Sequence, residues 1–218
     1  MRRIRTDTPV DALLDEIAAL PDIPGRRLIA IAGGPASGKS TLAEALVAAL
    51  NARNSSAVLV PMDGYHLDND VLDDMGMRHR KGAPETFDAA GFADTVKMLK
   101  SAPDIALPTF NRAFDKSVPN SIHVTPSHRI VVLEGNYLCL DETPWSDLAD
   151  YWDLSVYLDV SLDVTLLRLV QRWLDHGLSP KEATERAKSN DMANARRVAE
   201  NLGPVDIWLQ SDLAGFQN

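Results

Sequence analysis

The sequence is poor in cysteine and aromatic residues, and it contains no long apolar run. Its one cysteine, Cys139, cannot form an internal disulfide, which suits a reducing compartment. No run approaches the ~20 apolar residues that a transmembrane helix needs. The basic stretch 1–5 resembles the charged start of a signal peptide, but Thr6-Asp7-Thr8-Pro9 follows where an apolar stretch is required. We therefore expect a cytoplasmic protein that does not insert into a membrane.

Positive charge is also in deficit. The 218 residues include 22 Lys and Arg against 31 Asp and Glu, which gives a formal net charge of −9. Such an acidic chain is a poor candidate for binding nucleic acid, but it can hold a local basic site for a small-molecule substrate. The length suits one domain over 1–218. The apolar positions Val10, Leu13, Leu14 and Ile17 form one face of a first helix, which could serve the core or a homodimer.

Short apolar segments alternate along the chain with segments of helical periodicity. Strands that alternate with helices favour a parallel sheet covered on both faces, which is an α/β fold with three αβα layers. The apolar segments predict five buried strands, over residues 27–32, 57–62, 129–133, 155–160 and 205–209.

The connecting segments are less regular. Residues 63–88 are polar and predict mostly loop, with a short helix near 69–75. Residues 108–126 predict an irregular segment with short strands. A capping box at 179–182, with proline in the first turn, predicts one long helix that runs to about Leu202.

A glycine-rich loop follows the first predicted strand and fits the pattern G-x-x-x-x-G-K-[ST]. Glycine lets backbone N–H groups turn toward phosphate oxygens, the lysine charge reaches the outer phosphates, and the serine hydroxyl can ligate Mg²⁺. A turn without a ligand is the alternative, but the preceding strand and the following helix favour phosphate binding. The predicted phosphate site consists of Gly33, Gly34, Pro35, Ala36, Ser37, Gly38, Lys39, Ser40 and Thr41.

Two carboxylates stand at the ends of predicted strands. Asp63 follows the strand 57–62, and parallel strands end at the same edge of a sheet. It could take the proton of an acceptor hydroxyl during phosphoryl transfer, or it could cap the turn at Gly64. Glu134 ends the most apolar strand, where it could hold Mg²⁺ directly or through water, or could face solvent.

Two groups of cations could act on the phosphates or on the acceptor. Arg168 and Arg172 share a helix face and could clamp the transferring phosphoryl group, or form a solvated face paired with Asp175. The segment 78–82 is the densest basic cluster in an acidic chain and could face the acceptor or solvent. His66 could bind the substrate or be a hydrogen-bonded structural residue.

Together these residues resemble the phosphoribulokinase/uridine kinase superfamily, which includes bacterial type I pantothenate kinase. The resemblance runs from about Leu28 to Leu209. The sequence that follows Glu134, Gly135-Asn136-Tyr137-Leu138, looks closer to a branch named fructose transport system kinases or nucleoside/nucleotide kinase-like proteins. The resemblance rests on the loop 33–40, Asp63-Gly64-Tyr65, the segment 80–88 (RKGAPETFD), Leu133-Glu134-Gly135 and the strand–helix run 153–173.

The resemblance implies a P-loop nucleoside triphosphate hydrolase fold, with a helical lid near 168–190, that uses ATP and Mg²⁺. It implies Asp63 as the base and Lys39 as the phosphate binder, with Ser40 and Glu134 near Mg²⁺. Arg172 matches a lid arginine that contacts the γ-phosphate, and Arg168 lies one turn before it. Substrate contacts are implied at Tyr65, His66, Arg80, Lys81, Arg112, Glu134 and Asn201.

Arg112 is where the chain departs from this pattern, because pantothenate kinase has a histidine there. The acceptor could therefore be a sugar, a pantothenate-like molecule or a nucleoside, and an arginine could favour one that carries phosphate or carboxylate. A nucleoside monophosphate kinase would look much alike. A guanine-nucleotide switch usually carries Asn-Lys-x-Asp, which is absent from the sequence. A regulator that binds Mg·ATP without catalysis would not need Asp63 and Glu134.

Overall fold

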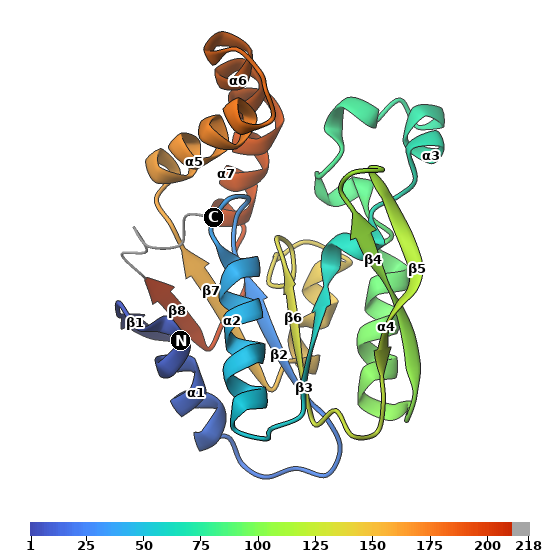
Figure 1. The fold of residues 1–218 in the computed structure, drawn as a ribbon, viewed down its shortest axis with the longest axis vertical. Helices are drawn as coiled ribbons and strands as arrows, with labels where there is room; N and C mark the ends of the chain where they lie inside the picture. Colours follow the sequence, from blue (N-terminus) through green and yellow to red (C-terminus); the bar gives the residue numbers. More distant parts are fainter. Residues whose placement is uncertain (211–218) are drawn as a thin grey trace.

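A sheet of six parallel strands forms the centre of the computed structural model, which describes residues 1–210 (Figure 1). The strand order is β1-β8-β7-β2-β6-β3. This order places the carboxyl ends of three neighbouring strands side by side, at the edge where ligands bind in open parallel sheets. The strands are β1 (Arg2–Arg5), β2 (Arg27–Ala32), β3 (Ala57–Pro61), β6 (Ile130–Gly135), β7 (Leu154–Asp159) and β8 (Ile207–Gln210).

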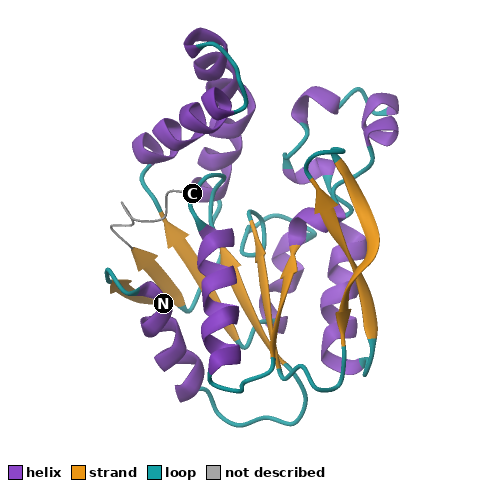
Figure 2. Cartoon of the chain, viewed as in Figure 1, coloured by secondary structure: helices purple, strands orange, loops and turns teal. Residues whose placement is uncertain are grey.

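Helices cover both faces of the sheet, so the predicted three-layer αβα fold is confirmed (Figure 2). In β2, Leu28 and Ala30 pack with α4 on one face, while Ile29 and Ile31 pack with α1 and α2 on the other. Both faces are apolar because both are covered. The helices are α1 (Pro9–Ala19), α2 (Lys39–Ala52), α3 (Asn69–Asp74), α4 (Ala89–Ser101), α5 (Leu162–Asp175), α6 (Pro180–Arg186) and α7 (Met192–Glu200).

The sheet has one strand more than the five that the sequence predicted. β1 pairs with β8 at the edge of the sheet, with Arg2 opposite Ile207. An edge strand can form from main-chain pairing alone, so its charged sequence carries no apolar signal. The guanidinium of Arg3 lies 5.3 Å from the centroid of the Trp208 ring, which adds a cation–π contact.

The apolar face of α1 belongs to the core. Leu13, Leu14 and Ile17 are buried with α2 and the sheet. Of the two uses that the sequence left open for this face, the structure shows the core packing. The short helix expected near 69–75 is confirmed as α3.

Residues 108–126 are more regular than predicted, because they fall largely in an antiparallel hairpin of β4 (Ile105–Asn111) and β5 (Lys116–Val124). The hairpin packs against the 3-10 helix Met62–Tyr65 that follows β3. The contact requires glycine at position 64, since a Cβ there would lie 2.5 Å from the carbonyl oxygen of Pro108. This close approach fixes the hairpin turn relative to the end of β3.

A helical lobe of α5, α6 and α7 stands beside the glycine-rich loop (Figure 1). Its predicted capping box is confirmed between Ser179 and Glu182. The long helix predicted from there to about Leu202 is confirmed, because helical backbone runs without a break over residues 180–200, but it contains a π-helical segment, Ala187–Asp191, between α6 and α7. Such segments are frequent at functional sites. No helix within residues 1–210 is long and apolar enough to cross a membrane.

Candidate active site

The glycine-rich loop connects β2 to α2, as predicted. A Cβ on Gly33 would lie 2.7 Å from Ser37 Oγ and 3.1 Å from the carbonyl oxygen of Leu158, so a larger residue would have to displace these groups. Ala36 and Gly38 adopt positive φ angles of 58° and 93°, which turn the backbone toward the start of α2. α2 begins at Lys39 without a side-chain cap, so its first N–H groups can donate to a phosphate.

Ser40 and Glu134 meet at the end of β6, beside this loop. Ser40 Oγ donates to Glu134 Oε2 across 3.1 Å. Burial raises the pKa of Glu134, while the positive charge of Lys39 opposes that shift. A hydroxyl and a carboxylate are oxygen donors that suit Mg²⁺. The described residues hold no group of three or more His, Cys, Asp or Glu that could bind a metal, so phosphates and water would complete the ligand shell.

Asp63 lies at the end of β3 in the 3-10 turn. Its carboxylate raises the pKa of Glu134 and opposes the lowering of the pKa of Arg172, so it acts electrostatically on both. Arg112 Nη2, from the hairpin turn, donates to Asp63 Oδ2 across 3.3 Å. The structure thus brings together Asp63, Glu134 and Arg112, which lie far apart in the sequence.

His66 is hydrogen-bonded to the backbone of Asp63. Its Nδ1 lies 2.8 Å from the carbonyl oxygen of Asp63, and it must donate because a carbonyl oxygen only accepts. The ring packs against Phe87 and Phe110, with centroid distances of 4.0 and 4.5 Å. Burial lowers the pKa of His66, so the ring is neutral at pH 7. These contacts show the structural role that the sequence left open for this residue.

Tyr65 does not join the site. Its hydroxyl is hydrogen-bonded to Thr95 across 2.7 Å, and its ring packs against Phe92 in the core. The structure therefore offers no support for the predicted substrate contact at Tyr65. A substrate contact at this residue stays a prediction from the motif.

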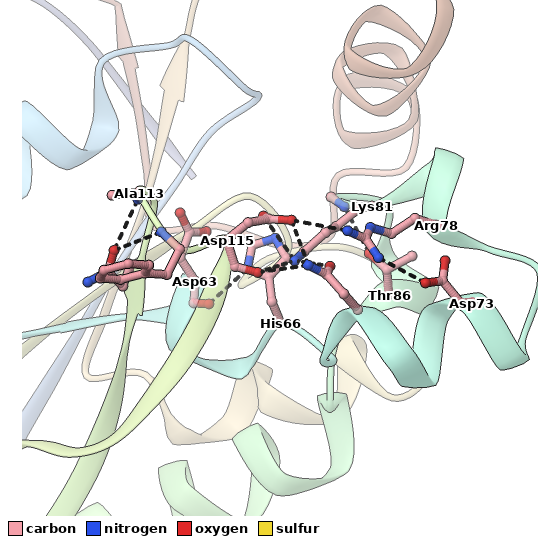
Figure 3. A network of polar contacts seen from close by, with 12 residues as sticks. Asp63, His66, Asp73, Arg78, Lys81, Thr86, Ala113 and Asp115 are labelled. Atoms are coloured by element: carbon pink, nitrogen blue, oxygen red, sulfur yellow. Dashed lines mark hydrogen bonds and ion pairs between the residues drawn. The ribbon is translucent and has the colours of Figure 1, made fainter.

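The basic cluster 78–82 forms one wall of the site through a polar network (Figure 3). Lys81 Nζ donates to Asn69 Oδ1 across 2.7 Å and lies 3.0 Å from Asp115 Oδ1. Arg78 pairs with Asp73 at 3.0 Å. The network ties α3 and the hairpin turn together through Lys81, while Arg78 and His79 remain exposed to solvent.

Arg168 and Arg172 reach the site from α5. Arg168 Nη1 donates to the carbonyl oxygens of Ala36 and Ser37 across 3.3 and 3.1 Å. Loss of hydration and the positive charge of Arg112 lower the pKa of Arg172, so the two guanidinium groups repel each other. Within residues 1–210, Asp175 accepts a hydrogen bond from Gln171 and forms no ion pair with Arg172 or Arg168.

Two buried asparagines of the helical lobe were not predicted from the sequence. Asn190 and Asn194 are 4% and 3% exposed, and neither Oδ1 has a hydrogen-bond partner among the described residues. Asn190 Nδ2 donates to the carbonyl oxygen of Lys81 across 2.9 Å. By contrast, the predicted contact Asn201 is exposed and bonds back to Arg197 at the end of α7. The i, i+4 spacing of the two buried amides was the available signal, because it places them on one helix face.

Comparison with known proteins gives a consistent family. The family model described as "Phosphoribulokinase / Uridine kinase family" matches residues 28–187. The chain is 41% identical over 195 residues to "Putative uridine kinase C227.14" of Schizosaccharomyces pombe, covering 85% of this chain and 83% of that protein. It is 33% identical over 202 residues to "Uncharacterized protein YggC" of Escherichia coli, covering 91% of this chain and 84% of that protein.

Solved structures agree with this match. A crystal structure titled "putative fructose transport system kinase", from Silicibacter sp. TM1040, superposes with a TM-score of 0.89 at 45% identity, covering 91% of this chain and 98% of that one. YFH7 from Saccharomyces cerevisiae, titled "a putative P-loop containing kinase with a circular permutation", superposes with a TM-score of 0.76 at 23% identity. It covers 94% of this chain and 98% of its own, and at that identity it supports the fold alone.

Proposed function

The chain belongs to the phosphoribulokinase/uridine kinase family and is an ATP-dependent small-molecule kinase, and we propose that Asp63 is the base that accepts the proton of the acceptor hydroxyl. One observation carries the proposal. The strand order sets β2, β6 and β3 side by side, so the phosphate loop, Glu134 and Asp63 stand at three neighbouring strand ends. A phosphate, a cation and a hydroxyl can therefore meet there.

Each part of the site has a role in this reaction. The loop amides and Lys39 hold the phosphates of ATP. Ser40 and Glu134 would hold Mg²⁺, which when bound neutralises phosphate charge. Arg172, whose pKa responds to the charge of Asp63, would stabilise the charge of the transferring phosphoryl group.

In the phosphoryl transfer, each bond that forms is matched by one that breaks, and the proton goes to a residue of the site. The acceptor oxygen bonds to the γ-phosphorus, the bond from that phosphorus to the ADP oxygen breaks, and the acceptor proton moves to Asp63. Asp63 is aided by His66, whose hydrogen bond to its backbone oxygen holds the turn in place.

The experiment is ADP release from Mg·ATP with a panel of acceptors. The relatives' names direct the panel to fructose and uridine, and pantothenate, cytidine, other sugars, sugar phosphates and nucleoside monophosphates complete it. We expect one strong responder, whose phosphorylated product identifies the acceptor hydroxyl. Binding of Mg·ATP, seen by thermal shift, without turnover of any acceptor would contradict the proposal and favour a non-catalytic regulator.

A further inference from the structure

The ion pair between Asp63 and Arg112 joins the proposed base to the turn of the β4–β5 hairpin. Arg112 Nη2 and Asp63 Oδ2 lie 3.3 Å apart, and the two side chains are 67% and 31% exposed. An exposed pair of this kind contributes very little to the stability of a fold. Its presence at the reaction centre therefore suggests a use in the reaction.

The pair conflicts with the role of the base. Arg112 donates to one of the two oxygens of Asp63, so it competes with an acceptor hydroxyl for hydrogen bonding to that oxygen. An acceptor that presents its hydroxyl to Oδ2 has to displace Arg112 from Asp63. The group that draws it away has to bind a guanidinium at least as well as a carboxylate does, and a neutral hydroxyl does not.

Neighbouring cations of the same wall are already held by acidic partners. Lys81 is paired with Asp115, and Arg78 is paired with Asp73 (Figure 3). Arg112 has a long, exposed side chain, so it can turn to a ligand at low cost. Arg80, next to Lys81, is half-buried, and its side chain has no hydrogen bond or ion pair with any described residue, which leaves a second cation for an anionic ligand.

We propose that the acceptor carries an anionic group, a carboxylate or a phosphate, and that Arg112 leaves Asp63 to bind it. This inference rests on the proposed kinase function and names its substrate class. Arrival of the acceptor frees the base at the moment when a hydroxyl is present to use it. With water alone in the site, Arg112 stays on Asp63 and the hydrolysis of ATP stays slow.

The test uses acceptors matched in pairs that differ in the anionic group. D-glycerate with glycerol and pantothenate with pantothenyl alcohol test the carboxylate. Fructose 6-phosphate with fructose and uridine monophosphate with uridine test the phosphate. ADP release is measured for the wild type, for Arg112→Gln and for the control Arg53→Gln, which removes an exposed arginine at the C-terminal end of α2, outside the site. Release without any acceptor is measured as well.

We expect the wild type to favour the anionic member of the active pair by about 10²-fold or more in kcat/KM. Arg112→Gln should lose most of that preference and should hydrolyse ATP without acceptor faster than the wild type. Arg53→Gln should match the wild type in both measurements.

Two results would overturn the inference while leaving the kinase proposal intact. One is efficient turnover of a neutral acceptor with no gain from the anionic partner. The other is an Arg112→Gln variant that keeps both the wild-type preference and the wild-type basal rate. Bound ATP with no acceptor turned over, and with the same basal rate in all three proteins, would remove the proposed function and this inference with it.

Discussion

Arg168 Nη1 lies 3.1 Å from the carbonyl oxygen of Ser37, so the helical lobe is hydrogen-bonded directly to the phosphate loop. A second bond from the same nitrogen reaches Ala36. Arg172, one turn further along α5, is subject to the charges of Asp63 and Arg112 instead. One helix therefore carries two arginines with different surroundings, one at the loop backbone and one toward the reaction centre.

This difference predicts a split in kinetic effects. Arg168→Met should raise KM for ATP roughly 10- to 100-fold with little change in kcat, because it removes charged donors that hold the loop. Arg172→Met should lower kcat about 10²-fold or more, because it removes a donor needed as charge develops on the phosphoryl group. Steady-state kinetics with each variant as the control for the other checks this. A kcat effect confined to Arg168→Met would contradict the assignment.

His66 predicts a pH dependence of stability. Its pKa is lower in the folded protein than the value of about 6.5 expected when unfolded. Below about pH 6.5 the unfolded state binds more protons than the folded state, so the free energy of unfolding should decrease as the pH decreases. Above pH 7.5 this group should have no effect on the free energy of unfolding. His66→Asn keeps a donor for the Asp63 carbonyl oxygen without the titration.

Urea midpoints between pH 5 and 8 measure this contribution. The wild type should lose stability relative to His66→Asn as the pH falls through 6.5. His79→Asn, at an exposed histidine, should follow the wild type throughout. Parallel curves for the wild type and His66→Asn would show that burial of His66 has no such effect.

Gly64 predicts a steric effect at the end of β3. A Cβ there would lie 2.5 Å from the carbonyl oxygen and 2.8 Å from the carbonyl carbon of Pro108, which are backbone atoms that cannot move cheaply. Gly64→Ala should lower the free energy of unfolding by about 1–3 kcal/mol. The control Gly76→Ala meets no atom within 4 Å and tests only the cost of its φ of +66°. A smaller loss for Gly64→Ala than for Gly76→Ala would contradict the close packing.

The sequence predicted the parts of the site that depend on local pattern. The phosphate loop is recognisable from the pattern of eight consecutive residues. The positions of Asp63 and Glu134 could be predicted because parallel strands end at one edge of the sheet. The groups expected to contact phosphate and cation could therefore be named from the amino-acid sequence alone.

The missed parts depend on pairing between distant segments. β1 is a strand because it pairs with β8. The hairpin lies close to the turn that holds Asp63 because Gly64, which has no side chain, lets the backbone of Pro108 approach. Asn190 is buried against Lys81 only once the lobe and the wall are in place. Tyr65 and Asn201 were assigned by motif, and the motif does not determine which way a side chain points.

The proposed role of Asp63 is tested most directly by Asp63→Asn, a change that keeps the shape of the side chain and removes the base. With the acceptor found in the panel, kcat should fall about 10²- to 10⁴-fold. The dissociation constant for Mg·ATP should stay near the wild-type value, because the phosphate loop is untouched. Asp68→Asn, at an exposed aspartate just before α3, should leave both quantities unchanged. Normal turnover by Asp63→Asn would contradict the proposed role of this carboxylate.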